Sequence, residues 1–305
     1  MQSTVVQSTH TFYASAKGLT FEYVVHRPST TATTKHPSNI IVIQCPGWGL
    51  GSTYLQHGLQ DLCHPKDNNT LIFFHPCGTD GSSKPAASQM SSMPDLASDL
   101  EDLRQHLKLD RYPVLLGHSN GGAIALGYAE MYPTRVEKLI LLDHQLVGFQ
   151  DKRLLKLQAT RIDGRYQDAW DSMLSRRTAS DVEFTESVTA MWPLYFFDPG
   201  RYVPELLAGI GSRKLDVWCY EAQGRCDRDS GRDQMVEGLG KVRAKTLEIF
   251  GREDMICGIG IAERTVEGIA DAEFICYDGC GHFPWIEKKE ETLSDIRKFI
   301  EECES

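Results

Sequence analysis

A serine with a glycine two positions away on each side is the clearest chemical signal in the sequence. Residues 115–129 read LLGHSNGGAIALGYA, so apolar residues lead up to Ser119 and small residues follow it. This pattern predicts a buried strand, a tight turn and a helix, which together present the serine hydroxyl at the carboxyl edge of a sheet. Side chains at Gly117 and Gly121 would collide with neighbouring backbone in such a turn. Ser119 is therefore a candidate nucleophile.

A serine hydroxyl is a weak nucleophile unless a base accepts its proton and an acid orients that base. In a sheet of this kind the chain order is serine, acid, histidine. His282, in the glycine-rich segment GCGHFPWIE, follows the last expected strand and is the candidate base. Asp254 follows the strand pattern TLEIF and is the candidate acid, with Asp143, at the end of LILLD, as the alternative. His118 flanks the serine and is expected to support the pocket wall instead of acting as the base.

Backbone N–H groups must stabilise the negative oxygen that forms when a serine attacks a carbonyl. The residue after the nucleophile, Asn120, is expected to supply one of them. The second is expected from the glycine-rich segment CPGWGLGSTYL after the strand IIVIQ. Pro46 in this segment has no N–H to donate, so Trp48 is the candidate.

The pattern of apolar runs predicts an α/β fold with a mostly parallel, doubly wound sheet. A hairpin is expected over 9–28, and short apolar runs that end in Gly, Pro or a polar residue predict buried strands. These runs lie at 40–49, 70–78, 112–119, 136–144, 245–255 and 272–283. Helices are expected from 52, over 93–109, over 121–132 and over 290–302. Strand and helix alternate at the rhythm of such a sheet.

The alternation stops near residue 148 and resumes after about 230. The sequence therefore predicts a core in two parts, 1–147 and 231–305, with a helical cap inserted over 148–230. A connection of this length inside a compact domain is usually functional. Its aromatic residues have two possible roles, either as walls of a substrate pocket or as the core of the cap. Trp192, Tyr195 and Phe196 are the candidates in this segment for contact with a substrate, together with His118 from the core.

Composition limits the partners that this protein can have. The chain has 305 residues, a formal net charge of -10 and a pI of about 5.5, which argues against binding to nucleic acid. Its nine cysteines follow no disulfide framework or zinc-site spacing, so reduced thiols and no metal are expected. The first residues resemble no signal peptide, and no apolar run is long enough to span a membrane. A cytoplasmic protein acting on a small molecule, without a cofactor, is the resulting expectation, with the oligomeric state left open.

Four segments together resemble the α/β-hydrolase superfamily over most of the chain. They are PGWG, GHSNGG, FGREDM and GCGHFPWIEKKEE. The segment HPCGTDGSSKP is similar to a loop of the same family, although the usual Arg-Gly is replaced by Thr79-Asp80-Gly81, and Pro46-Gly47 stands where His-Gly is usual. GHFPWIE and WPLYFF are similar to the proline iminopeptidase branch, but the residues around the serine differ from that branch.

The resemblance implies acyl transfer at an ester, lactone, thioester or amide carbonyl. We therefore expect a serine hydrolase with a Ser119–His282–Asp254 triad that cleaves an ester or lactone of a small to medium apolar substrate. The alternatives are a proline iminopeptidase-like aminopeptidase, a cofactor-free oxygenase, or a cyclase that transfers an acyl group within one molecule. A ligand-binding protein without catalysis is a further alternative, although such a protein has no need of all three side chains.

Overall fold

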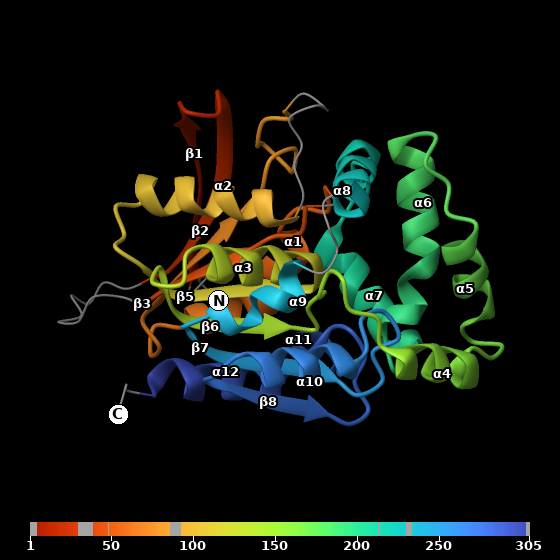
Figure 1. Cartoon of the computed structure of the whole chain (residues 1–305). Coiled ribbons are helices and arrows are strands. Elements are labelled where there is room, and N and C mark those ends of the chain that lie inside the picture. The colour runs from red at the N-terminus through yellow and green to blue at the C-terminus, as the bar shows by residue number, and fades with distance from the viewer. Residues whose placement is uncertain are drawn as a thin grey trace.

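A single mixed sheet forms the centre of the protein (Figure 1). The computed structural model describes residues 5–29, 39–47, 49–85, 93–212, 214–229 and 234–302. Among these residues, eight strands lie in the order β1-β2-β4-β3-β5-β6-β7-β8. β1 pairs with β2 and β2 with β4 in antiparallel fashion, whereas all the other neighbours are parallel. The expected α/β fold with a mostly parallel sheet is therefore confirmed.

The strands coincide with the apolar runs of the sequence. Their bounds are β1 (Val5–Ala14), β2 (Leu19–Pro28), β3 (Asn39–Gln44), β4 (Asn69–Phe74), β5 (Tyr112–His118), β6 (Val136–Leu142), β7 (Lys245–Gly251) and β8 (Ala272–Tyr277). Several strands end before the predicted limits, since the predicted ranges included the loops that follow them. β3, for example, ends at Gln44, two residues before Pro46, which has no N–H for strand pairing.

Successive side chains of the central strands enter two different hydrophobic cores, as the two-residue period of a strand requires. Ile41 and Ile43 of β3 face one core, whereas Val42 between them faces the other. The core around Val42 includes side chains from α2 (Met93–His106), α3 (Ser119–Met131) and α10 (Ile259–Gly268). The opposite core includes side chains from α1 (Thr53–Leu59), η1 (Gln60–Cys63), α11 (Pro284–Glu287) and α12 (Lys289–Glu301). Helices therefore cover both faces of the sheet.

The helix predicted over 93–109 ends at His106, three residues early. The backbone then turns through Lys108, which has a φ of 56°, and the N–H of Leu109 donates to the carbonyl of Arg104. A left-handed residue ends a helix in this way because it redirects the next N–H to an unpaired carbonyl. The leucine periodicity of the sequence continues past this turn, so it could not locate the end of the helix.

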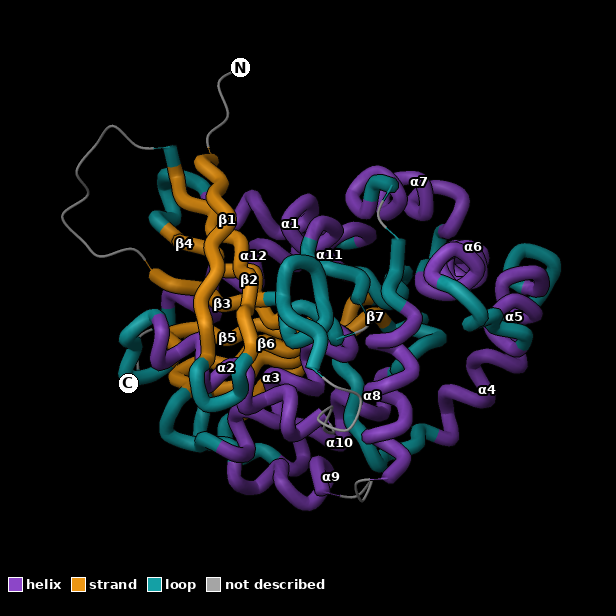
Figure 2. Tube along the Cα trace, turned by 90° about the horizontal axis from the view of Figure 1, so that it is seen from above, coloured by secondary structure: helices purple, strands orange, loops and turns teal. Residues whose placement is uncertain are grey.

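The segment between β6 and β7 is helical and lies beyond the carboxyl ends of the parallel strands. Its elements are α4 (Lys152–Arg161), α5 (Gln167–Leu174), α6 (Asp181–Met191), η3 (Trp192–Tyr195), α7 (Pro199–Ile210) and α8 (Val217–Asp229). Figure 1 shows α4 to α7 on the side toward which the arrows of β6 and β8 point, and Figure 2 shows the same group of helices beside the core. We propose that residues 148–230 form a cap over the sheet edge.

Two short elements, α9 (Gln234–Gly238) and η4 (Leu239–Lys241), lead from this segment back to the core. Both contact α3, so the chain has returned to the sheet-covering layer before β7 begins. Within the described parts of the chain, no helix combines the length and the apolar character needed to cross a bilayer.

Gly121→Ala is the substitution that tests the close packing of α3 on β3. A Cβ at this position would lie 2.3 Å from the carbonyl oxygen of Gln44, which is backbone and has no room to move. We expect the variant to lose roughly 1–3 kcal/mol of free energy of unfolding, as overpacked cores do. Gly164→Ala, where a Cβ would meet nothing within 4 Å, is the control and should change stability little. Urea denaturation of both variants checks this, and equal stabilities would contradict the packing described.

Candidate active site

Ser119 stands at the sharp turn that the sequence predicts. β5 ends at His118, α3 begins at Ser119, and the φ of Ser119 is 52°, a left-handed conformation that is costly for a residue other than glycine. A Cβ on Gly117 would lie 2.5 Å from the carbonyl oxygen of Gly121. Glycine is therefore required at 117 and at 121, as expected, because the turn brings strand and helix backbones into contact.

His282 and Asp254 are hydrogen-bonded at the same edge of the sheet. His282 Nδ1 lies 3.0 Å from Asp254 Oδ2, and both side chains are almost fully buried. Asp254 also accepts backbone N–H groups from Ile256 at 2.8 Å and from Cys257 at 3.2 Å. These donors fix the orientation of the carboxylate, so the proton of the imidazole lies on Nδ1 and the lone pair on Nε2. The structure thus brings together the predicted base and the predicted acid.

The Ser119 hydroxyl lies close to the thiol of Cys257. His282 Nε2 is buried and has no hydrogen-bond partner among the described residues. Burial, together with the nearby carboxylates of Asp254 and Asp143, raises the pKa of Cys257 well above its ordinary value, so this thiol stays protonated. Cys257 was not singled out in the sequence, and its position three residues after Asp254 is the signal that marks it.

His118 supports the segment after β8 that carries His282, the histidine loop. Its Nε2 lies 3.0 Å from the carbonyl oxygen of His282, and its Nδ1 lies 3.1 Å from the hydroxyl of Tyr54. The carbonyl requires a donor, so Nε2 carries the proton and Tyr54 donates to Nδ1. Burial and the proximity of His282 lower the pKa of His118 well below its ordinary value, so the ring is neutral. His118 therefore holds the backbone of the candidate base.

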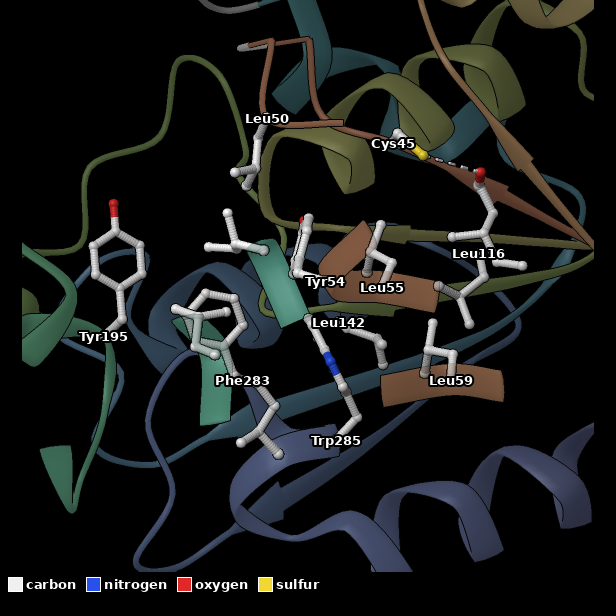
Figure 3. Close-up of a cluster of buried hydrophobic side chains, with 14 of the residues drawn as sticks. Cys45, Leu50, Tyr54, Leu55, Leu59, Leu116, Leu142, Tyr195, Phe283 and Trp285 are labelled. Carbon is white, nitrogen blue, oxygen red and sulfur yellow. Dashed lines mark hydrogen bonds between the residues drawn. The ribbon is translucent and has the colours of Figure 1, made fainter. Parts of the chain in front are cut away.

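Aromatic side chains from the histidine loop pack among the leucines of α1. Figure 3 shows Phe283 and Trp285 beside Tyr54, Leu55 and Leu59. The Trp285 ring is fully buried, and a Cβ on Gly58 of α1 would lie 2.0 Å from it. This packing fixes the loop that carries His282.

Asp143, the alternative acid, lies next to Asp254. It follows β6, is fully buried, and accepts a hydrogen bond from the N–H of Gly251 at 3.0 Å. Gly251 also links the two aspartates, because its carbonyl accepts the N–H of Asp254 at 3.2 Å. Burial and the charge of Asp254 raise the pKa of Asp143 well above its ordinary value. Only Asp254 has a hydrogen bond to the His282 ring among the described residues.

The loop after β3, which is expected to complete the oxyanion site, is hydrogen-bonded to the turn at Ser119. The N–H of Gly47 donates to the side-chain Oδ1 of Asn120 at 2.8 Å, so this N–H points at Asn120 and not at a substrate oxygen. Asn120 Nδ2 lies 3.3 Å from Gln145 Oε1, which joins the loop after β6 to the same network. Trp48, the residue predicted to supply the second N–H, lies outside the described residues.

A cavity of about 640 Å³ lies between residues 145–155, which follow β6, and the loop after β7 that carries Asp254, the acid loop. The loop after β6, the start of α4 and the acid loop supply its walls, which include Leu146, Val147, Phe149, Leu154, Ile256, Cys257 and Ile261. Cys257 joins this cavity to the nucleophile through its contact with Ser119. The N–H of Gln145, another lining residue, donates to the carbonyl of Ser119 at 3.0 Å. Sequence reasoning missed these residues, because the apolar residues around 146–155 carry no catalytic pattern.

The three aromatic residues predicted to contact a substrate are not among the lining residues of the larger cavity. Trp192 lines a second cavity of about 250 Å³, together with Leu50, Leu207 and Ile210. Phe196 is fully buried, with its ring centroid 5.1 Å from that of Phe283. Tyr195 is nearly buried, and its ring centroid lies 5.3 Å from that of His282. These side chains pack residues 192–196 against the core, and Trp192 also borders a cavity.

Glu287 connects residues 197–198 to the loop that carries His282. Its Oε1 accepts the N–H groups of Phe197 at 2.9 Å and Asp198 at 3.1 Å, and its Oε2 accepts the N–H of Gly281 at 2.5 Å. The N–H of His282 donates to the carbonyl of Tyr195 at 2.7 Å. The segment between η3 and α7 is therefore fixed directly to the loop that carries the candidate base.

Two groups within the described residues bring three possible metal-ligand atoms within 4.8 Å of one another. They are Asp254, Cys257 and His282, and Glu22, His75 and Asp80. In the second group His75 lies 3.1 Å from each of the two carboxylates, one at either ring nitrogen. Both groups are held by hydrogen bonds or ion pairs among their own members, so we assign neither of them to a metal.

The chain belongs to the alpha/beta hydrolase fold family, which matches residues 40–289. It is 24% identical over 263 residues to a probable proline iminopeptidase from Leptolyngbya boryana, with 78% of each chain covered. Its structure is similar to that of an esterase from Exiguobacterium antarcticum, with a TM-score of 0.67, 19% identity, and coverage of 92% of this chain and 96% of the esterase. It is also similar to 2-hydroxy-6-oxo-6-phenylhexa-2,4-dienoate hydrolase from a Rhodococcus species, with a TM-score of 0.68, 16% identity, and coverage of 98% and 100%. The predicted resemblance is thus confirmed at the level of the family.

Glu287→Gln tests the connection to residues 197–198 through its pH dependence. Burial raises the pKa of Glu287 to about 7 from 4.5, despite three N–H donors that favour the charged form. Between these values the folded protein keeps a proton that the unfolded chain has released, so wild-type stability falls as the pH rises. Glutamine removes this titration. The free energy of unfolding of wild type minus that of the variant should therefore decrease by up to roughly 3 kcal/mol between pH 4.5 and 7. Urea denaturation across this range measures it, and a constant difference would contradict the assignment.

Proposed function

We propose that this protein is a serine hydrolase that cleaves an ester or lactone of a small to medium apolar substrate. The observation that carries the proposal is the position of Ser119 in a strained turn at the same sheet edge as the hydrogen-bonded pair of His282 and Asp254. A left-handed serine between two obligatory glycines has a cost in backbone energy, and such strain is characteristic of functional sites. Membership of a hydrolase-fold family supports the same chemistry.

In the proposed reaction, Ser119 Oγ attacks the carbonyl carbon while His282 Nε2 takes the hydroxyl proton. Asp254 stabilises the imidazolium that forms, through the hydrogen bond to Nδ1. The tetrahedral intermediate then expels an alkoxide, which leaves with the proton from His282, and the acyl group remains on Ser119. Water, deprotonated by His282, attacks this acyl-enzyme and releases the acid.

The negative oxygen of the intermediate requires N–H donors that are already in place. We assign this role to the backbone N–H of Asn120, at the first turn of α3, where the helix dipole also favours negative charge. The bond between Gly47 and the Asn120 side chain holds the glycine-rich loop beside this position. The N–H of Trp48 is the proposed second donor.

The 640 Å³ cavity is the proposed site for the apolar part of the substrate. Cys257 is both part of its wall and in contact with Ser119, so a ligand in this cavity can reach the nucleophile. Most of the lining side chains are apolar, which favours an uncharged acyl or ring system. The second cavity, beside Trp192, is the alternative location, as the sequence analysis expected for this aromatic residue.

Aminopeptidase activity is the second candidate, because relatives named as proline iminopeptidases align with most of the chain. Amide hydrolysis would use the same three side chains and the same acyl-enzyme. A parallel screen of acyl esters of varied chain length and of aminoacyl amides distinguishes the two activities.

Ser119→Ala tests the nucleophile. The smaller side chain fits the turn, so the variant should fold normally and lose at least roughly a thousandfold in kcat for any ester that wild type cleaves. Labelling by a fluorophosphonate should also be lost. Cys257→Ala is the matched control, since it removes a thiol close to the hydroxyl and should keep the label. Hydrolysis by Ser119→Ala above a tenth of the wild-type rate would overturn the assignment.

Leu154→Phe and Trp192→Ala separate the two cavities. Leu154 lines the larger cavity, so a bulkier side chain should lower kcat/KM for long-chain esters by about tenfold more than for acetyl esters. Trp192 borders the smaller cavity, and its replacement should then change all chain lengths by a similar factor. The opposite result, with selectivity altered only in Trp192→Ala, would move the substrate to the smaller cavity.

A further inference from the structure

The glycine-rich loop that joins β3 to α1, residues 45–52, is attached at both ends to the end of β4. At its start, Cys45 donates its N–H to the carbonyl of Phe74 at 3.1 Å. At its end, the hydroxyl of Ser52 lies 2.7 Å from Nε2 of His75, the residue that follows Phe74 in the chain. Two successive residues at the end of one strand therefore hold both ends of this loop.

The His75 ring is itself fixed from several directions. Its side chain is 2% exposed, its Nδ1 lies 3.1 Å from Glu22 Oε1 of β2, and its Nε2 also lies 3.1 Å from Asp80 Oδ2. Its backbone carbonyl accepts the hydroxyl of Ser82 at 2.8 Å. A ring with partners at both nitrogens cannot rotate without breaking a contact, so it is a rigid anchor for the Ser52 hydroxyl.

This anchor comes from the segment HPCGTDGSSKP, which begins with His75 and includes Asp80 and Ser82. The segment resembles a loop of the family, but the reaction proposed above gives it no part.

The hydroxyl of Ser52 does not serve α1 as a cap. Ser52 precedes the helix at the position where a serine usually accepts an N–H from the first turn, but among the described residues no such hydrogen bond forms. The side chain is 1% exposed, and besides His75 it accepts a hydrogen bond from Nε2 of Gln56 at 2.6 Å. A buried hydroxyl that does not cap its own helix is best explained by its bond to the ring.

We propose that His75 is a positioning residue of the active site, which holds the glycine-rich loop, through Ser52, in the place that oxyanion stabilisation requires. The inference rests on the proposed function, which assigns the second oxyanion donor to this loop. The same loop is also bonded to the residue after the nucleophile, because the N–H of Gly47 donates to Asn120 Oδ1 at 2.8 Å. Oxyanion donors are effective only when they are in place before the reaction, and a misplacement of about 1 Å can cost roughly a hundredfold in rate.

His75→Asn and His75→Gln form the matched pair for the test. The amide of asparagine can replace Nδ1 and keep the bond to Glu22, whereas the amide of glutamine can replace Nε2 and keep the bond to Ser52. His75→Asn should lower kcat by roughly tenfold and change KM by less than about twofold, since binding of the ground state does not use the oxyanion donors. His75→Gln should lose less than about threefold in kcat, and Ser52→Ala should reproduce the loss seen in His75→Asn.

Inhibition by a trifluoromethyl ketone distinguishes positioning from a general loss of stability. Ser119 Oγ bonds to the ketone carbon, His282 takes the hydroxyl proton, and the carbonyl electron pair moves to the oxygen, which then needs the same donors as the intermediate. The inhibition constant should therefore rise in His75→Asn and Ser52→Ala by the factor by which kcat/KM falls. Ser187→Ala, which removes a buried hydroxyl that accepts the N–H of Arg177 in the cap segment, is the control and should change neither quantity.

A merely structural role would give a different result. His75→Asn would then contain fewer sites that react with a fluorophosphonate, but each reactive site would keep the wild-type kcat and inhibition constant. That result would overturn the proposal, as would an equal loss of kcat in His75→Asn and His75→Gln. If His75→Asn fails to fold, Ser52→Ala decides, because it removes only a hydroxyl.

Hydrogen exchange in the peptide that covers residues 45–52 tests the attachment without reference to activity. Exchange should be at least about tenfold faster in His75→Asn and Ser52→Ala than in wild type, because the loop is released at one end. Unchanged exchange would show that His75 does not hold the loop, and faster exchange with wild-type kcat would show that holding it does not matter for catalysis. A wild-type protein that neither cleaves an ester nor reacts with a fluorophosphonate would instead mark a failure of the proposed function, and exchange would still decide whether His75 holds the loop.

Discussion

The parallel register of β5 to β8 is the constraint on which the candidate site depends. His118 pairs with Leu142, Leu142 with Ile249, and Gly251 with Tyr277, so the carboxyl ends of these strands lie side by side. The residues that follow each end are brought to a single edge, although they are separated by long stretches of sequence. In order of the strands they are Ser119, Asp143, Asp254 and His282. A change of register by one residue would turn these side chains toward the opposite face.

Backbone strain and buried acidic groups are concentrated at this edge, and the rest of the fold must offset their cost in free energy. Ser119 and Asp143 both have positive φ, and the acidic side chains of Asp143, Asp254 and Glu287 are buried here. The apolar cores on both faces of the sheet supply the stabilisation, and the hydrogen bonds of Glu287 and His118 hold the histidine loop in place. Strain and buried charge at one edge of an otherwise regular fold are expected of a functional site.

The sequence predicted the elements whose signals are local. Ser119 lies between two glycines at which any side chain would collide with backbone, so the turn was predictable. The strands around it are continuous apolar runs, so the sheet was predictable as well. His282 and Asp254 followed from the chain order expected of this architecture. The end of α2 was predicted wrongly, because leucine spacing continues through the turn at Lys108.

Contacts that depend on tertiary structure were not predictable from local patterns. The sequence posed Asp143 and Asp254 as alternatives, whereas the structure buries both at one edge, where the N–H of Gly251 donates to Asp143 and its carbonyl accepts the N–H of Asp254. Cys257 lies close to Ser119, and Glu287 accepts the N–H of Phe197, because residues far apart in the sequence meet at this edge. The division into core and cap, and the role of Trp48, stay predictions.

Mass spectrometry of an acyl-enzyme tests the central claim most directly. The protein would be mixed with an activated ester that it hydrolyses, quenched with acid within the first turnover, and digested for peptide mapping. The account predicts an acyl group on the peptide that carries Ser119, present in wild type and lost in Ser119→Ala. An adduct on Cys257 instead, or steady turnover without any adduct on Ser119, would contradict it.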